Sequence, residues 1–285
     1  MNVKIIADSA CDLPLSFFEE HSVSFLPLSV DIHGKQLQDQ KEIEPKEIYD
    51  EMRNGVIVKT SQVSPLMLKD VFTEHAKEGV PCLYVAFSSE LSGTYQTAEM
   101  VRNEVLEEFP QFELAIIDTK CASLGHGLAV KYAVKLANED KSLIELEKAV
   151  REYCPKIEHI FTVDNLEYLA RGGRISKASA FVGGLLNIKP LLHVEDGKLI
   201  PLEKLRGRKK VFKRIIELMK ERGKNLQNQT IAISHGDDID AANEMKAMIE
   251  EAFSPKEVYI NYVGAVVGAH AGPGTLAIFF LNEDQ

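Results

Sequence analysis

Two hydroxyl clusters are the residues of this chain best suited to hold an anion. Thr60 and Ser61 lie in the polar segment 59–65, and Ser92-Gly93-Thr94 opens a predicted helix shortly after the apolar run 83–87. Backbone N–H groups at a helix start are unpaired and partly positive, so together with hydroxyls they can hold a carboxylate or a phosphate. Helix capping alone explains either cluster, but two clusters near helix starts favour a shared site.

His270 is the histidine with the most suggestive surroundings. Four glycines accompany it in the segment 264–275, which we expect to be a loop between two apolar strands. Glycine allows a ligand to approach the backbone closely, and a histidine there can donate a hydrogen bond to an anion. A structural loop with a surface histidine is the alternative. We expect no special role for the isolated histidines, and only a weak case for His126 and His193; the isolated ones are His21, His33, His75 and His159.

A basic tract reverses the charge of the chain locally. Residues 201–214 hold seven Lys or Arg and one Glu, a net charge of +6 within a chain of net charge -10. Arg171 and Arg174 lie upstream of it. A solvated helix face is the ordinary interpretation of such a run, but the sign reversal favours a docking patch for an acidic or phosphate-bearing partner.

Several functional classes are disfavoured by what the sequence lacks. The net charge argues against general nucleic-acid binding, and we find no Walker A, G-x-G-x-x-G or G-x-S-x-G motif. The four cysteines are widely spaced, so we expect buried thiols rather than disulfides or zinc. No metal ligands or catalytic residues are predicted. The short apolar N-terminus and the absence of a long apolar run predict a soluble, cytoplasmic protein.

The elements that position these residues alternate between strands and helices in the first half of the chain. This order predicts a parallel sheet with helices on both faces, with the loops after Ala7, Phe87 and Ile117 at one sheet edge. In the second half, Asp196-Gly197 between two apolar runs predicts a hairpin in a mixed sheet covered on one side. We therefore expect two domains, residues 1–156 and 157–285.

A series of short segments along nearly the whole chain matches one known family pattern. In chain order they are Asp8-Ser9 with Asp12-Leu13-Pro14, Lys59-Thr60-Ser61-Gln62 with Ser64-Pro65, Ser89 with Leu91-Ser92-Gly93-Thr94-Tyr95-Gln96, Asp164-Asn165-Leu166 with Arg171-Gly172-Gly173-Arg174, Lys189-Pro190, Asp196-Gly197, Arg206-Gly207-Arg208, and His270 with Gly272-Pro273-Gly274-Thr275. In these segments the chain resembles the DegV family of bacterial fatty acid-binding proteins. One departure is Val63, where the family commonly has proline.

The resemblance implies a two-domain fold like that of DegV proteins and dihydroxyacetone kinases. A parallel three-layer α/β/α domain would be joined to a two-layer α/β domain with a mixed sheet. A long-chain fatty acid such as palmitate would lie between them, its carboxylate held by Thr60 and Ser92 with His270 close by. Ser61, Gly93 and Thr94 would complete this site. Candidates for the tunnel wall, with ordinary core packing as the alternative, are Phe181, Val182, Leu185, Leu186 and Ile188.

The resemblance also implies a carrier without catalytic residues or cofactor. In some members a separate kinase converts the bound acid to an acyl-phosphate, and the arginines matching Arg174 and Arg206 are implicated in partner or phosphate contacts. A hydrolase or acyltransferase using Ser92 and His270 is the alternative, although no carboxylate to orient His270 is identifiable. A phosphotransferase is disfavoured because no nucleotide motif is present. Whether the tract 204–214 docks a partner or touches a membrane surface stays open.

Overall fold

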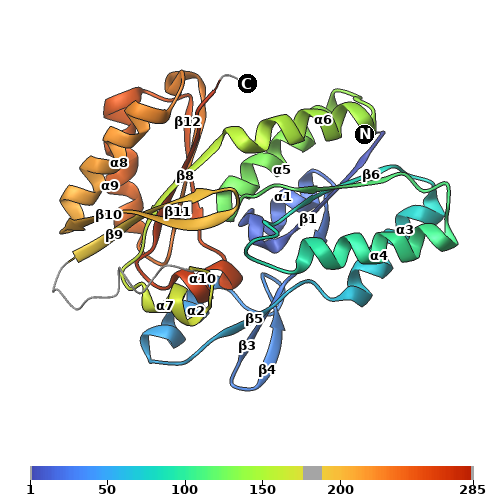
Figure 1. Ribbon diagram of the computed structural model, residues 1–285, viewed down its shortest axis with the longest axis horizontal. Helices are drawn as coiled ribbons and strands as arrows, with labels where there is room; N and C mark the ends of the chain where they lie inside the picture. The colour runs from blue at the N-terminus through green and yellow to red at the C-terminus, as the bar shows by residue number, and fades with distance from the viewer. Residues whose placement is uncertain (1, 176–187, 284–285) are drawn as a thin grey trace.

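Three β-sheets organise residues 2–175 and 188–283, the part of the chain that the computed structural model describes (Figure 1). The first sheet is parallel throughout, as predicted. Its strands, in spatial order, are β2 (Ser24–Leu26), β1 (Lys4–Asp8), β6 (Cys82–Ala86) and β7 (Leu114–Asp118).

Both faces of the parallel sheet are buried because successive side chains along each strand point in opposite directions. Ile5 and Leu83 belong to a hydrophobic cluster with α5 (Ser123–Asn138) and α6 (Leu143–Tyr153). Ile6 and Tyr84 belong to a second cluster with α3 (Pro65–Glu78) and α4 (Thr94–Glu108). The predicted three-layer α/β/α arrangement is therefore confirmed.

The second sheet is mixed. Helices α8 (Arg208–Arg222) and α9 (Ile239–Phe253) cover one of its faces, at the left of Figure 1. The predicted hairpin forms, with φ of 49° at Asp196 and 81° at Gly197. Helix α9 was missed by the sequence analysis. The strands, in spatial order, are β10 (Lys198–Arg206), β9 (Ile188–Glu195), β8 (Ile157–Thr162), β13 (Leu276–Leu281), β11 (Thr230–His235) and β12 (Glu257–Tyr262).

Helix α5 joins the two halves of the chain. It packs on β1 and β6 of the parallel sheet and on β8, β11 and β13 of the mixed sheet. As a result 12 of its residues are buried, and Val85 of one sheet and Phe279 of the other belong to one hydrophobic cluster. The mixed sheet is thus a two-layer unit with α8 and α9, and its remaining face packs against the N-terminal half.

A small antiparallel sheet, at the bottom of Figure 1, was not predicted. It consists of β4 (Lys35–Gln38), β3 (Ser29–Ile32) and β5 (Lys59–Ser61). The segment 59–65, expected to be a loop, therefore begins as a strand. Its pairing with β3, about thirty residues upstream, leaves no periodic signal in three residues.

The segment 264–275 also differs from expectation, because α10 (Ala265–Ala271) occupies most of it. Its glycines disfavour a helix, but five of its seven residues are buried. It packs on α2 (Pro45–Arg53), where Tyr49 donates a hydrogen bond to the Val263 carbonyl at 2.8 Å. Tertiary packing therefore overrides local propensity here.

The remaining elements are short. They are α1 (Leu15–Glu20), α7 (Glu167–Arg171) and the 3₁₀ turns at Ser9–Cys11, Cys154–Lys156 and Leu226–Asn228.

All four cysteines are buried and free, as predicted. The sequence also predicts a small-residue helix over 176–186, a segment that lies outside the described residues. Within the described residues, no helix combines the length and apolarity needed to cross a membrane.

Candidate functional site

A cavity of about 270 Å³ lies between the parallel sheet and the mixed sheet. The loops after β6 and β7 line it, as predicted for the carboxyl ends of parallel strands. The loop after β1 does not reach the lining. The described lining residues are Leu28, Thr60, Ser61, Gln62, Phe87, Leu91, Ser92, Gly93, Ala122, Ser123, His159, Phe161, Leu169, Arg174, Val194, Leu199, Val263, Val266, Val267, His270, Ala271, Thr275, Ala277 and Phe279.

The predicted head-group residues meet at one end of this cavity. Thr60 Oγ1 and His270 Nε2 lie 2.7 Å apart although 210 positions separate them in the chain. Ser92 and Gly93 line the same cavity as this pair. Thr94 is buried behind them: its hydroxyl lies 2.9 Å from Ser92 Oγ, and its N–H donates to the same oxygen at 3.2 Å. The structure thus brings both hydroxyl clusters and the histidine together.

Two glycines permit close approaches beside this site. A Cβ atom on Gly93 would lie 2.3 Å from Gln62 Oε1, and one on Gly172 would lie 2.2 Å from His270 Nδ1. The two glycines therefore let the segment after β5 approach the start of α4, and let the chain after α7 approach the imidazole. Gln62 is held in turn by a 2.5 Å hydrogen bond to Thr97 Oγ1.

Burial keeps His270 neutral. Desolvation, with a smaller contribution from the nearby Arg174 guanidinium, lowers the pKa of His270 to about 4. Arg174 donates to the backbone carbonyls of Leu91 at 3.2 Å and Gly172 at 2.5 Å. No carboxylate among the described residues pairs with it, so it supplies positive charge at the polar end of the cavity. An anion there would meet hydroxyls, a neutral imidazole and one guanidinium.

This geometry does not assemble a serine nucleophile. His270 Nε2 contacts Thr60, whereas the Ser92 hydroxyl contacts Thr94. No acidic side chain in the described part of the chain orients the imidazole, and a pKa of about 4 makes His270 a weak base. The alternative reading of Ser92 with His270 as a catalytic pair therefore finds no geometric support.

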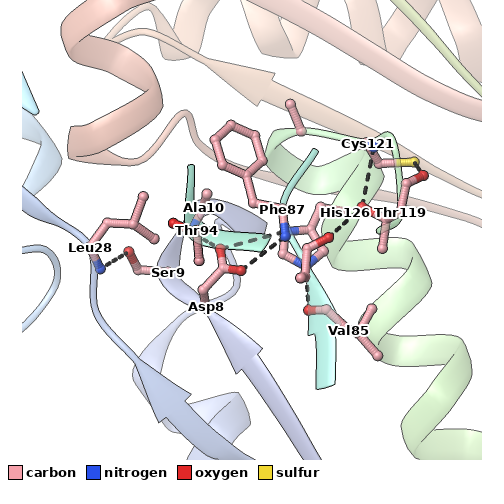
Figure 2. Close-up of polar contacts among 12 residues, drawn as sticks. Asp8, Ser9, Ala10, Leu28, Val85, Phe87, Thr94, Thr119, Cys121 and His126 are labelled. Atoms are coloured by element: carbon pink, nitrogen blue, oxygen red, sulfur yellow. Dashed lines mark hydrogen bonds and ion pairs between the residues drawn. The ribbon is translucent and has the colours of Figure 1, made fainter. Parts of the chain in front are cut away.

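Asp8 and Ser9 do not line the cavity, but each forms a hydrogen bond to a segment that lines it. Figure 2 shows the buried Asp8 carboxylate accepting the Phe87 N–H at 2.9 Å, and the Ser9 hydroxyl accepting the Leu28 N–H at 3.1 Å. Phe87 and Leu28 are both lining residues. Asp8 also accepts the hydroxyl of Tyr84 at 2.9 Å. The first strand thus positions the start of the turn that carries Ser92.

The apolar end of the cavity extends along the mixed sheet. Thr275, Ala277 and Phe279 alternate along β13 and its approach, and all three line the cavity. At about 3.4 Å per residue this run spans roughly 13 Å. Leu199 pairs with Val194, and His159 pairs with Phe279. Continuing the β8–β9 register by one residue beyond Ile160 and His193 places these two pairs in one row at the far end. The cavity is therefore elongated, with one polar end and one apolar end.

His159 and Ser123 line the cavity although neither was predicted to do so. His159 Nε2 accepts the Ala122 N–H at 3.3 Å, and its Nδ1 lies 3.0 Å from the Ile157 carbonyl. Burial lowers the pKa of His159 to about 4, so the ring is a neutral part of the apolar wall. Ser123 Oγ contacts the buried Asp12 carboxylate. No local pattern marks either residue, because the folding of distant strands brings them together.

Arg206 does not line the cavity. Arg206 is exposed at the end of β10, where it pairs in register with Ile188 of β9. Thr275 lies at the same end of the mixed sheet. Two of the seven basic residues of the tract form ion pairs, Arg208 with Asp238 and Arg214 with Glu203. Of the predicted tunnel residues, 181, 182, 185 and 186 lie outside the described residues. Ile188 begins β9 and is not among the lining residues.

A second cavity of about 340 Å³ shares Thr60, Arg174 and His270 with the first. Its described lining also contains Lys59 and Arg171 and no acidic residue. Thr60, Arg174 and His270 therefore lie between the first cavity, which is largely apolar, and this second, basic cavity. Residues 2–175 and 188–283 contain no group of three or more His, Cys, Asp or Glu arranged to hold a metal ion.

Comparisons with known proteins agree with this geometry. A family model described as an uncharacterised protein of the DegV family matches residues 2–283. A DegV domain-containing protein of Clostridium perfringens is 42% identical over 284 residues, which are 99% of this chain and 98% of that one. A solved structure described as fatty acid binding of a DegV family protein from Thermus thermophilus superposes with a TM-score of 0.90 and 32% identity, covering 99% of this chain and 100% of that one. A crystal structure of DegV, described as a fatty acid binding protein from Bacillus subtilis, has a TM-score of 0.86 and 28% identity, with coverage of 99% and 100%.

Proposed function

The chain belongs to the DegV family, and we propose that it binds a long-chain fatty acid such as palmitate in the cavity between its two larger sheets. The observation that carries this proposal is the two-ended cavity. It has hydroxyls and one guanidinium at one end and a row of mostly apolar side chains at the other. Relatives whose solved structures are described as fatty acid-binding share the fold at similar length.

The energetics of an acyl chain suit such a cavity. Each buried CH₂ group contributes about 0.8 kcal/mol, so a long chain can supply most of the binding free energy. A carboxylate left unpaired at the inner end would oppose binding strongly. We infer that the hydroxyls of Thr60 and Ser92 donate to it, with His270 aligning Thr60. Ser61, Gly93 and Thr94 shape the same site, and Arg174 balances its charge.

We further propose that the bound acid is presented to a separate kinase, which forms an acyl-phosphate. The basic cavity shared by Arg174 and His270 supports this role, because a phosphoryl group on the carboxylate would need positive charge there. Exposed Arg206 lies at the same sheet end as Thr275, so we assign it a partner contact. In this proposal the chain is a carrier and leaves catalysis to its partner.

A variant of Ser92 tests the head-group assignment. Ser92→Ala should weaken binding of palmitate by about 10- to 100-fold, the effect of losing one hydrogen bond to a charged group. Isothermal titration with delipidated protein measures the change, and circular dichroism checks that the fold persists. Ser89→Ala is the matched control, because Ser89 bonds to Asp118 and does not line the cavity. Equal affinities in wild type and Ser92→Ala would contradict the assignment.

The class of ligand is tested by extracting the purified protein with organic solvent and identifying lipids by mass spectrometry. A nearly stoichiometric fatty acid is the expected result. A protein that is empty and also fails to take up added acid would refute the carrier proposal. Covalent labelling of Ser92 by a fluorophosphonate probe would instead favour a hydrolase.

A further inference from the structure

We infer that the β9–β10 hairpin is the end wall of the acyl-chain cavity and that Ser88 positions this wall by holding the hairpin tip. The inference rests on the proposed fatty acid-binding function and deepens it, because the end wall would determine which chain lengths are retained. Neither Ser88 nor the hairpin belongs to the head-group site.

The hairpin faces the end of the cavity farthest from His270. Val194 and Leu199 are opposite each other in register on β9 and β10, and both line the cavity. Register across the sheet continues this pair to His159 and Phe279. Because Phe279 lies roughly 13 Å along β13 from Thr275, a short acyl chain anchored at the polar end stops before this row, whereas a longer chain reaches it.

One of the two turn residues at the hairpin tip is buried, although hairpin tips normally project into solvent. Gly197 is buried, whereas its neighbours Asp196 and Lys198 are exposed. A Cβ atom on Gly197 would lie 2.5 Å from Ser88 Oγ and 2.7 Å from Lys120 Cδ. Glycine at position 197 thus adopts the positive φ that the turn needs, and it allows the hairpin backbone to approach the N-terminal half closely.

Ser88 connects the tip to the head-group turn. Its hydroxyl, fully buried, donates to the Gly197 carbonyl at 3.0 Å and accepts the Glu90 N–H at 3.3 Å. Its own carbonyl accepts the Ser92 N–H at 3.1 Å. One residue therefore touches both the backbone of the carboxylate-binding turn and the tip of the distal wall.

Charged side chains surround this contact. Glu90 lies between two lysines, with Lys120 Nζ at 3.3 Å and Lys198 Nζ at 3.5 Å. The Lys198 pair again joins the hairpin to the turn that carries Ser92. Exposed pairs of this kind contribute little, so the buried Ser88 hydrogen bond is the main anchor.

The consequence for ligand selection follows from the placement of the wall. Val194 and Leu199 are only partly buried, and they pack against the cluster that spans both sheets. A chain that fills the row Leu199–Val194–His159–Phe279 would complete this packing. A shorter chain would not contact this row, so fixing the hairpin in place would not change its binding affinity. Ser88 should therefore affect long acids and spare short ones.

The test compares dissociation rates of octanoic and hexadecanoic acid from delipidated, reloaded protein by stopped-flow displacement. Ser88→Ala should release hexadecanoic acid about five-fold faster, as expected for one lost hydrogen bond, and leave octanoic acid unchanged. Ser89→Ala is the matched control, because its hydroxyl bonds within the N-terminal half to Asp118. Equal acceleration of both acids would overturn the inference, since it would place the effect at the head group. An unchanged hexadecanoic acid rate would overturn it as well.

A second pair of variants tests the wall even if Ser88→Ala does not fold. Leu199→Ala should shift binding towards longer acids, by about four-fold for each methylene newly enclosed. Leu202→Ala, on the same strand but packed against the α8–α9 face, should not shift it. An identical chain-length profile in Leu199→Ala and wild type would refute the wall assignment. Failure of wild type to bind any acid would instead refute the proposed function.

Discussion

His270 illustrates how burial decides the chemistry of a titratable side chain. The sequence places it among glycines, where either a charged or a neutral imidazole could contact an anion. In the fold, desolvation lowers the pKa of His270 to about 4, so the ring is neutral at physiological pH. Its partner is Thr60, and positive charge comes from Arg174 instead. The histidine thus acts through the alignment of a hydroxyl.

This lowered pKa predicts a pH-dependent contribution of His270 to stability. Between the unfolded pKa of about 6.5 and the folded value of about 4, only the unfolded chain binds the proton. Stability therefore falls as the pH falls through this window. Relative to His270→Asn, the ligand-free wild type should lose up to about 3 kcal/mol of unfolding free energy between pH 7 and pH 4.

Urea titrations of the two proteins across this range measure the difference. The other titrating groups are common to both proteins and cancel in the comparison. Parallel stability curves for wild type and His270→Asn would show that the folded histidine titrates normally.

Helix α10 is the element that brings His270 to the site, and its glycines serve packing. A Cβ atom on Gly268 would lie 2.3 Å from the Tyr49 hydroxyl oxygen and 2.8 Å from Tyr49 Cζ. Tyr49 is fully buried in α2 and bonded to the Val263 carbonyl, so it has little freedom to move. The helix therefore lies against α2 at a distance that only glycine allows.

Gly268→Ala should displace α10 and with it the His270–Thr60 contact. Overpacking of this kind costs about 1–3 kcal/mol, and we expect a lower melting temperature together with weaker palmitate binding. Thermal unfolding and calorimetric titration measure the two effects.

Ala269→Gly, one position along, is the control. It lowers helix propensity by about 1 kcal/mol but adds no atom to the α2 contact. Palmitate affinity reduced equally by both variants would indicate that helix stability matters, and not the packing of Gly268.

At the scale of the whole molecule, α5 makes the two halves depend on each other. It packs on both sheets, and the cluster that contains Val85 also contains Phe279. The division into structural domains 1–156 and 157–285 stays a proposal. The shared helix argues that neither unit has a complete core without the other.

Calorimetry should accordingly show one cooperative transition for the full chain. The ratio of van't Hoff to calorimetric enthalpy should be close to one, because the shared cluster couples both sheets. Two resolved transitions would show that the halves unfold independently despite α5.

The sequence by itself determined the order of most helices and strands, the parallel and hairpin segments, and which hydroxyls we propose as an anion-binding set. These follow from local patterns: apolar periodicity, Asp-Gly turns and hydroxyls at helix starts. Tertiary structure alone decided that β5 is a strand, that α10 is a helix, and that His159, Ser123 and the hairpin reach the cavity. Those features depend on contacts between residues far apart in the chain, and such contacts leave no periodic trace in the sequence.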